Sequence, residues 1–291
     1  MIETLIQAVL LGGLYTLFAL GLSLMFGVMR LTNVTQGDCI ILAAFAVIGA
    51  ISFAGAAPWL AIAIVMPLSF AVGYVLQRFV LNRTLGKDPL PSLVVTFGLS
   101  IVVQNALMEV FSADPRSIDT GTLATQSLQV GSITLGVLPL IILAVALVAT
   151  AGLQGLFSRT ALGRSFRAVS DDPAIAELMG LKAGRVYALA TGIAFVLIAI
   201  AGAMQGMRTT VAPADGPMLL LFAFEAVIIG GMGSFWGTLA GAMILALAQQ
   251  IGFRFDPGWG IWFGHIVFLA VLVVRPQGLF DCLPRQAERR A

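Results

Sequence analysis

The stretch SRTALGRSFRAVSDDPAIAELMGLKAGR, residues 158–185, is the longest polar interval of the chain that also carries helix signals. Apolar runs stand on either side of it, at residues 135–157 and 186–207. An α-helix needs about 20 predominantly apolar residues to cross the hydrocarbon layer of a membrane, and both runs have that length. The stretch is therefore predicted to be a loop between two membrane-spanning helices, and whatever it docks onto lies outside the bilayer.

A short helix is predicted inside this loop. Asp171 or Asp172 can cap its N-terminus, and Pro173 suits the first helical position, where a missing N–H costs nothing. Residues 174–179 then provide one to two turns, and Gly180 is a natural C-terminal stop.

The predicted helix has a small apolar face formed by Leu178, Met179 and Leu181. A helix of this length is too short to be stable alone. A short capped helix with an apolar face suits insertion into a groove on another protein. An amphipathic turn that lies on the membrane surface is the alternative.

The composition identifies an integral membrane protein. The 291 residues are 59% hydrophobic and 10% charged, with a mean hydropathy of +1.00, whereas soluble domains carry about 25% charged residues. The net charge of +2 does not indicate nucleic acid, because the basic residues lie between apolar runs rather than in one patch. Cys39 and Cys282 imply no disulfide framework. Glu3 stands where a signal peptide would carry Lys or Arg, so the first apolar run is expected to be retained.

Apolar runs long enough to be candidate crossings recur along the whole chain. They lie at about 4–29, 37–54, 59–80, 92–111, 135–157, 186–207, 217–232, 235–252 and 259–275. The runs at 217–232 and 235–252 are short. The predicted fold is an all-α polytopic membrane protein, with about eight to nine transmembrane or re-entrant helices in a single transmembrane domain over residues 1–291.

The basic residues predict the orientation, because cytoplasmic loops carry an excess of Lys and Arg. If the N-terminus is outside, 13 of the 16 Lys and Arg residues fall on the inner side, and only Arg116, Arg208 and Arg254 fall outside. The N-terminus is thus predicted outside, and the loop 158–185 and the C-terminus in the cytoplasm. The loop at 112–134 is then periplasmic, and the alternating stretch SLQVGSITLG that begins in it (127–136) predicts a small β-hairpin.

Glycines cluster in the segment IIGGMGSFWGTLAGA, residues 228–242. The spacing of Gly233, Gly237 and Gly241 allows close helix contact. The segment is also typical of a broken or re-entrant helix with its break at Gly233 and Ser234, and discontinuous helices are typical of transport sites. Two roles stay open for Gly230, Gly231, Gly233 and Ser234, namely tight helix packing and lining of the translocation path.

Polar side chains at membrane depth are few. They include Asn33, Gln36 and Asp38 between the first two runs, Gln104, Asn105 and Glu109 in the fourth run, Gln205 at the end of the sixth and Glu225 in the seventh. An acidic group at the centre of a span costs about 3 kcal/mol on insertion scales. Glu225 is therefore expected to face a partner or a wet cavity, whereas Glu109 is close to the outer end of its run. His265 is expected to be a packed or interfacial residue rather than a proton relay.

Motifs for enzymatic chemistry are missing from the sequence. The chain has no G-x-x-x-x-G-K-[ST] pattern for ATP binding. One histidine and two distant cysteines do not make a metal-ligand set, and Ser234 lacks the G-x-S-x-G setting of a serine nucleophile. We expect a transporter or a channel, with no cofactor and no enzymatic activity of its own.

Four segments resemble a known family. LGGLYTLFALGLSLMFGVMRLTNVTQGDCIILAAF (11–45) is similar to the opening of LivH-type permeases of branched-chain amino acid ABC importers. FRAVSDDPAIAELMGLKAGRV (166–186) resembles the cytoplasmic coupling loop of that family. FEAVIIGGMGSFWGTLAGA (224–242) and VVRPQGLF (273–280) are similar to its C-terminal blocks.

The resemblance implies a permease subunit in the inner (plasma) membrane of a bacterium. Its partners would be a second related permease, two cytoplasmic ATP-hydrolysing subunits and a periplasmic solute-binding protein. The resemblance places five residues on the coupling helix that enters a cleft on the ATPase, namely Asp172, Ala176, Glu177, Leu178 and Gly180.

One departure from the family pattern bears on the substrate. The family usually has His-Gly-Glu where this chain has Gln36-Gly37-Asp38. Asn33, Gln36 and Asp38 keep the polar character, so they are still expected to act in helix packing or in the path. The expected substrates are branched-chain or other hydrophobic amino acids. Urea, amides and aromatic or carboxylic acids are the alternatives within this importer type, and a homo-oligomeric channel is the alternative of a different class.

Overall fold

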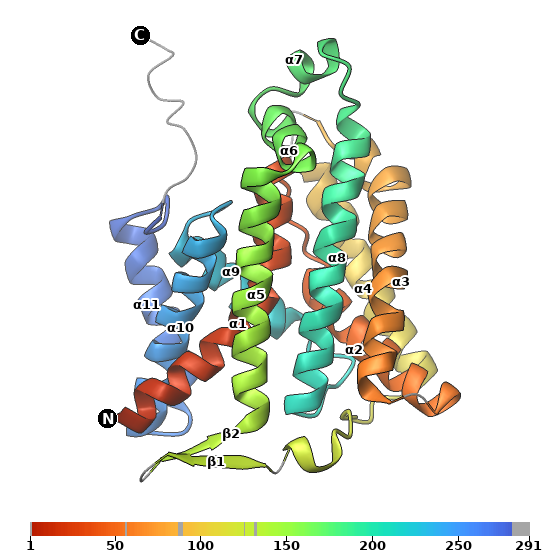
Figure 1. Cartoon of the computed structure of the whole chain (residues 1–291). Coiled ribbons are helices and arrows are strands. Elements are labelled where there is room, and N and C mark those ends of the chain that lie inside the picture. The colour runs from red at the N-terminus through yellow and green to blue at the C-terminus, as the bar shows by residue number, and fades with distance from the viewer. Residues whose placement is uncertain (1, 56, 87–89, 125, 131–132, 281–291) are drawn as a thin grey trace.

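The computed structural model describes residues 2–55, 57–86, 90–124, 126–130 and 133–280. Within these ranges the chain folds into α-helices, two short 3-10 helices and one small antiparallel hairpin (Figure 1). In chain order the elements are α1 (Ile2–Met29), α2 (Gln36–Ala54), α3 (Pro58–Phe79), η1 (Leu81–Arg83), α4 (Leu90–Phe111), η2 (Gly121–Ala124), β1 (Ser127–Val130), β2 (Ile133–Gly136), α5 (Val137–Arg159), α6 (Ala161–Asp171), α7 (Pro173–Leu178), α8 (Ala183–Arg208), α9 (Gly216–Gly230), α10 (Phe235–Phe255) and α11 (Trp259–Val274).

The helices confirm the predicted all-α polytopic fold. Each of the nine apolar runs coincides with a helix, and seven helices in the described part of the chain are long and apolar enough to cross a membrane. The two shorter apolar helices are α9 and α11. The hairpin predicted in SLQVGSITLG is also present, with Ser127 opposite Gly136.

Helix α1 is the centre of the bundle. Its most apolar 18-residue window is 89% buried, because α5, α8, α9 and α10 pack around it. A helix that is apolar on all sides is stable only where other helices or lipid cover every side. In Figure 1, α1 runs from the N-terminus through the middle of the molecule toward α6.

Four glycines of α1 each lie against a different part of the structure. A Cβ atom on Gly12 would come within 3.0 Å of a backbone atom of α10, and one on Gly13 within 2.9 Å of a backbone atom of α5. A Cβ on Gly21 would lie 3.3 Å from a carbonyl oxygen of α8, and one on Gly27 would lie 3.1 Å from the Cα of Gly233. Small residues at these positions allow the backbones to approach closely, as in other membrane helix pairs.

Helices α9 and α10 form the predicted broken segment. Gly230 ends α9 and Ser234 caps α10, where its hydroxyl accepts a hydrogen bond from the backbone N–H of Gly237 at 3.1 Å. Between them Gly231 and Gly233 have φ values of +102° and +85°, which glycine adopts without strain. We refer to residues 231–234 as the α9–α10 turn.

Helices α2 and α9 both begin inside the bundle. The side chain of Gln36, at the start of α2, reaches the carbonyl of Phe18 in the middle of α1. Gly37 lies against the carbonyl of Gly216, the first residue of α9, so closely that a Cβ atom would overlap it. Residues 31–35, which are buried or half-buried, therefore return from the end of α1 to its middle as non-helical backbone, and protein cover is the setting in which such backbone is tolerated at membrane depth.

The polar stretch 158–185 contains one more helix than the sequence analysis predicted. Besides α7, it forms α6, which Thr160 caps by accepting a hydrogen bond from the N–H of Gly163 at 3.1 Å. Gly163, Phe166 and Val169 are its buried residues and recur every third position. That spacing marks one helix face, but the polar residues between them made α6 look like loop.

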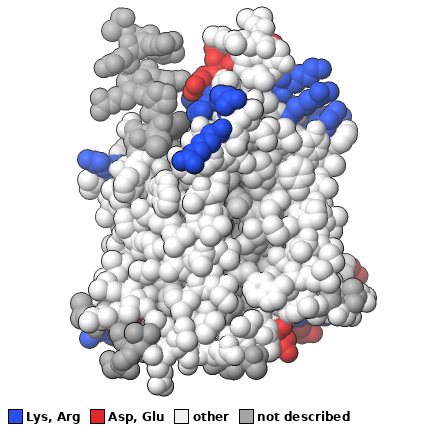
Figure 2. All heavy atoms as spheres, viewed as in Figure 1, with Lys and Arg blue, Asp and Glu red and all other residues white. Residues whose placement is uncertain are grey.

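Lys and Arg residues gather at the end of the molecule that carries α6 and α7. Figure 2 shows this concentration on one face, around the tips of α3, α6 and α8. The orientation across the membrane stays a prediction. Lys87 and the C-terminal tail from residue 281, with Cys282, lie outside the described residues.

The contact between the starts of α2 and α9 predicts a specific sensitivity. Replacing Gly37 by Ala should destabilise the protein by about 1–3 kcal/mol, because overpacking forces two backbones apart. The matched control is Gly98→Ala in α4, where a Cβ atom meets open space. Thermal unfolding in detergent measures both variants, and a wild-type melting temperature for G37A would contradict the observed packing.

Candidate functional site

Buried polar side chains surround the start of α2. Asn33, Gln36 and Asp38, three residues singled out from the sequence, are all buried. Gln36 Nε2 donates to the carbonyl of Phe18 at 2.7 Å, and Asn33 Oδ1 accepts from the N–H of Thr35 at 3.1 Å. The structure thus brings the three residues together and uses two of them to hold the non-helical backbone.

Asp38 joins three helices. Its carboxylate accepts hydrogen bonds from Ser100 and from Gln104, at 2.8 Å for the latter, and both donors lie on α4. On the other side it touches Gly216, so closely that a Cβ atom there would overlap the carboxylate. Negative charge near a helix start is favoured by the helix dipole, so this position suits Asp38.

Helix α4 is held to this junction largely by polar contacts. Its most apolar window is 17% buried, the lowest value among the seven long apolar helices found in the described chain. Besides the two bonds to Asp38, the hydroxyl of Thr35 donates to the carbonyl of Thr96 at 2.6 Å. We refer to Thr35, Asp38 and their partners on α4 as the α2–α4 junction.

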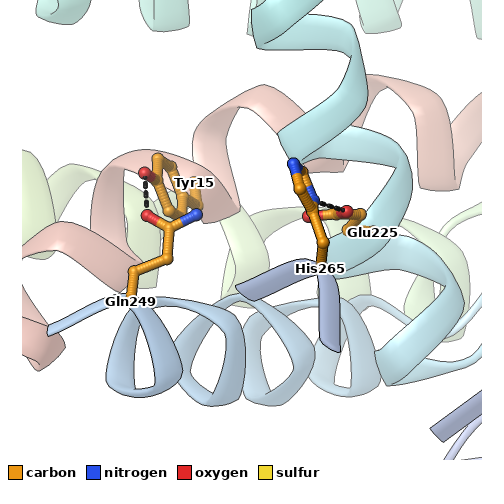
Figure 3. Close-up of polar contacts among 4 residues, drawn as sticks. All are labelled: Tyr15, Glu225, Gln249 and His265. Atoms are coloured by element: carbon orange, nitrogen blue, oxygen red, sulfur yellow. Dashed lines mark hydrogen bonds and ion pairs between the residues drawn. The ribbon is translucent and has the colours of Figure 1, made fainter. Parts of the chain in front are cut away.

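Glu225 has a partner, as expected for a carboxylate at membrane depth. It is 1% exposed, and its Oε1 is hydrogen bonded to Nδ1 of His265 on α11 (Figure 3). Its second oxygen, Oε2, has no hydrogen-bond partner. His265 is therefore a packed residue that links α11 to α9.

A second buried pair lies nearby between α1 and α10. Tyr15 donates to Oε1 of Gln249 at 2.6 Å (Figure 3). Its ring also stacks on Phe222, with the centroids 5.0 Å apart. The amide of Gln249 also lies beside Gly264, the neighbour of His265. The first pair links α9 to α11 and the second links α1 to α10 by polar contacts.

The α7 segment has the local structure that its sequence predicts. Asp172 Oδ1 accepts hydrogen bonds from the N–H groups of Ala174 and Ile175, at 2.9 and 3.1 Å. Gly180 follows the helix with a φ of +88°. Asp172 and Gly180 therefore define the ends of this short helix.

The residues predicted on α7 differ in exposure. Ala176 is buried against the bundle, whereas Glu177 is exposed. Leu178 is 88% exposed and Met179 80% exposed. Two large apolar side chains thus project from the tip of the molecule, and Ala176 instead fixes the helix to the rest of the protein.

The α9–α10 turn borders a cavity of about 360 Å³ at the same end of the molecule. Gly233 and Ser234 line it together with Gly27, Phe157 and Ser170. The final described residues close the other side of the turn, because the N–H groups of Leu279 and Phe280 donate to the carbonyls of Ile229 and Gly230. These carbonyls belong to the last turn of α9 and would otherwise lack a helical partner.

Glu109 lies apart from these groups. Its side chain is exposed near the end of α4, away from the α2–α4 junction. The structure therefore does not bring Glu109 together with the other predicted residues.

Several residues of these contacts had not been selected as site residues from the sequence. Gln249 is polar within an apolar run, so the rule that selected Glu225 could also have found it. Ser100, Thr35 and Thr96 give no such signal, because hydroxyl side chains are common in membrane helices, where they bond to the backbone.

Comparison with known proteins gives a family match over nearly the whole chain. Residues 4–275 match the family model described as "Branched-chain amino acid transport system / permease component".

Relatives with assigned names agree with this match. The chain is 26% identical to the high-affinity branched-chain amino acid transport system permease protein BraD of Pseudomonas aeruginosa, over 96% of this chain and 95% of BraD. It is 25% identical to the corresponding protein LivH of Escherichia coli, over 96% of this chain and 94% of LivH.

A solved structure supports the fold alone. "PsaBC from Streptococcus pneumoniae in complex with Fab" aligns with a TM-score of 0.51 and 13% identity, covering 94% of this chain and 93% of that one. The family is shown by the match of the family model to residues 4–275. The chain belongs to the family of permease components of branched-chain amino acid transport systems, the membrane subunits of ATP-binding cassette importers.

Proposed function

We propose that this permease moves branched-chain or other hydrophobic amino acids into the cytoplasm. The observation that carries the proposal is the full-length similarity to BraD and LivH, both named for branched-chain amino acid transport. ATP hydrolysis belongs to a separate subunit, and permeases of this kind work in the inner membrane with ATPase and binding-protein partners.

The assembly that we propose contains a second related permease, two cytoplasmic ATPases and a periplasmic solute-binding protein. The N-terminus lies outside and the loop 158–185 in the cytoplasm, with loop 112–134 toward the binding protein. The concentration of Lys and Arg at the α6–α7 end supports this orientation.

Helix α7 is the proposed contact to the ATPase. Its exposed Leu178 and Met179 suit an apolar groove, and Glu177 and Gly180 lie beside them at the same tip. Asp172 and Ala176 act indirectly, because one caps the helix and the other packs it against the bundle.

The residues at membrane depth have two proposed roles. Asn33 and Gln36 hold the non-helical backbone before α2, and Asp38 joins the start of α2 to α4 and to α9. We place the translocation path next to these three residues. Gly230, Gly231, Gly233 and Ser234 serve the tight packing and the turn of the α9–α10 hairpin. Glu225 serves as a tether between helices rather than as a path-lining group, because its carboxylate is buried and bonded to His265.

The proposed function is tested with the whole transporter. The permease is co-purified from its host membrane with the ATPases and second permease, reconstituted into liposomes, and supplied with its binding protein and internal or external ATP. Labelled leucine, isoleucine and valine should be imported in an ATP-dependent manner. Import of urea, a short amide and an aromatic acid is measured in parallel. Import of one of these compounds in place of the three amino acids would contradict the proposed substrate class.

Replacing Leu178 by Asp should weaken assembly with the ATPase about 10- to 100-fold. This range corresponds to losing the burial of one leucine side chain, about 1.5–3 kcal/mol. Co-purification of the ATPase measures the effect, and Leu178→Met is the matched control that keeps an apolar side chain at the same position. Normal assembly and normal uptake by L178D would show that α7 is not part of the ATPase interface.

Replacing His265 by Leu should lower stability by about 1–3 kcal/mol, because it leaves the buried Glu225 without its partner. The double variant Glu225→Leu, His265→Leu should recover part of this loss. A double-mutant cycle on thermal unfolding should give a coupling energy of about 0.6–1.7 kcal/mol, which lies between the average and the largest value measured for hydrogen bonds between membrane helices. If the double variant folds normally but does not transport, Glu225 lines the path and the tether role is wrong.

A further inference from the structure

The cytoplasmic contact helix does not itself reach the spans that begin inside the bundle. Helix α7 packs on α6 and on the start of α8, whereas α6 packs on α1, α5 and α8. A force that a partner applies to α7 therefore reaches the bundle through α8 and through α6. This makes the contacts of α6 the place to look for residues that position the transport machinery.

One contact route leads from α6 through α1 to the α9–α10 turn. The hydroxyl of Ser170, near the end of α6, donates to the carbonyl of Gly27 at 2.8 Å. Gly27 lies near the end of α1, where an added Cβ atom would be 3.1 Å from the Cα of Gly233. Ser170 thus bonds to the backbone segment that directly abuts the turn.

A second, independent route leads from α6 through α5 to the same turn. Phe166 of α6 is fully buried, and its ring centroid lies 5.4 Å from that of Phe157 near the end of α5. Phe157 in turn meets Phe235, the first residue of α10, in an edge-to-face contact with centroids 4.9 Å apart. The two routes therefore end on Gly233 and on Phe235, at either side of Ser234.

A pocket that opens to the protein surface lies between the two routes. The cavity of about 360 Å³ is bordered by Gly27 and Ser170 of the first route and by Phe157 and Phe235 of the second. Packed protein interiors resist displacement because they hold few voids larger than a water molecule. The pocket therefore leaves the turn less tightly packed against α6 than an interior contact would be.

We propose that Ser170 and Phe157 are positioning residues for import, which couple a displacement of α6 and α7 to the α9–α10 turn. The inference rests on the proposed function, since it assumes an ATPase that acts on α7. It adds a specific destination for that action, namely residues 231–234 at the end of α9.

The test uses the reconstituted importer and measures the amount of solute imported per ATP hydrolysed. Ser170→Ala should lower this ratio roughly 2- to 10-fold, the change that loss of one hydrogen bond produces, while assembly with the ATPase stays intact. Ser170→Thr keeps the hydroxyl and should restore the ratio. The control is Ser165→Ala, which removes a hydroxyl of the same helix that bonds only locally, to the carbonyl of Ala161.

Gly27→Ala tests the first route, from α6 through α1, without removing a contact. Alanine is the better helix former, so α1 itself should not be weakened. The added Cβ should displace the turn and lower the ratio in the same direction as Ser170→Ala. Gly152→Ala on α5 is the matched control, because a Cβ atom there meets open space. Phe157→Leu tests the second route.

The outcomes separate the two proposals. If the wild-type importer takes up no amino acid, the proposed function fails. If the wild type transports but S170A, G27A and F157L keep its ratio, the coupling route is overturned while the function stands. Equal losses of uptake and ATP hydrolysis in these variants, or the same loss of the ratio in the S165A and G152A controls, would also overturn it.

Discussion

The close contact of α1 with its neighbours is the constraint on which the rest of the structure depends. Apolar side chains do not drive helices to associate in a membrane, because the surrounding lipid is equally apolar. Membrane helices therefore associate where their backbones can approach closely. In α1 the glycines at positions 12, 13, 21 and 27 provide such places toward α10, α5, α8 and the α9–α10 turn. A central helix surrounded in this way leaves little freedom for the position of any neighbour.

Polar contacts add specificity to this packing. Asp38, Glu225 and Gln249 are buried at membrane depth, and each bonds to a residue on another helix. An unpaired polar group there is costly, so each pair selects one arrangement of its helices. Asp38 holds the poorly buried α4, and Glu225 holds α11 at the edge of the bundle (Figure 1).

Features that depend on residues close together in the sequence could be predicted, whereas contacts between distant parts of the chain could not. Asp172, Pro173 and Gly180 act within one helix, so the ends of α7 could be read from neighbouring residues. The nine apolar runs likewise needed only local hydropathy. Partners from distant parts of the chain could not be inferred, since His265 lies 40 positions after Glu225 and Ser100 lies 62 after Asp38. Helix α6 was missed because its buried face contributes only three residues between polar ones.

The four segments that carry the family resemblance, far apart in sequence, meet at one place. Gly27 comes from the first, Ser170 from the second, Gly233 from the third, and Leu279 and Phe280 from the last. The contacts are of kinds that tolerate little substitution: a backbone approach at glycine, a hydroxyl to a carbonyl, and N–H groups that satisfy the end of α9. A turn held on several sides, yet bordered by a cavity, can move as a unit without exposing its polar backbone to lipid. That combination suits the end of a helix in a transporter, because a buried backbone group without a partner costs free energy comparable to a lost hydrogen bond.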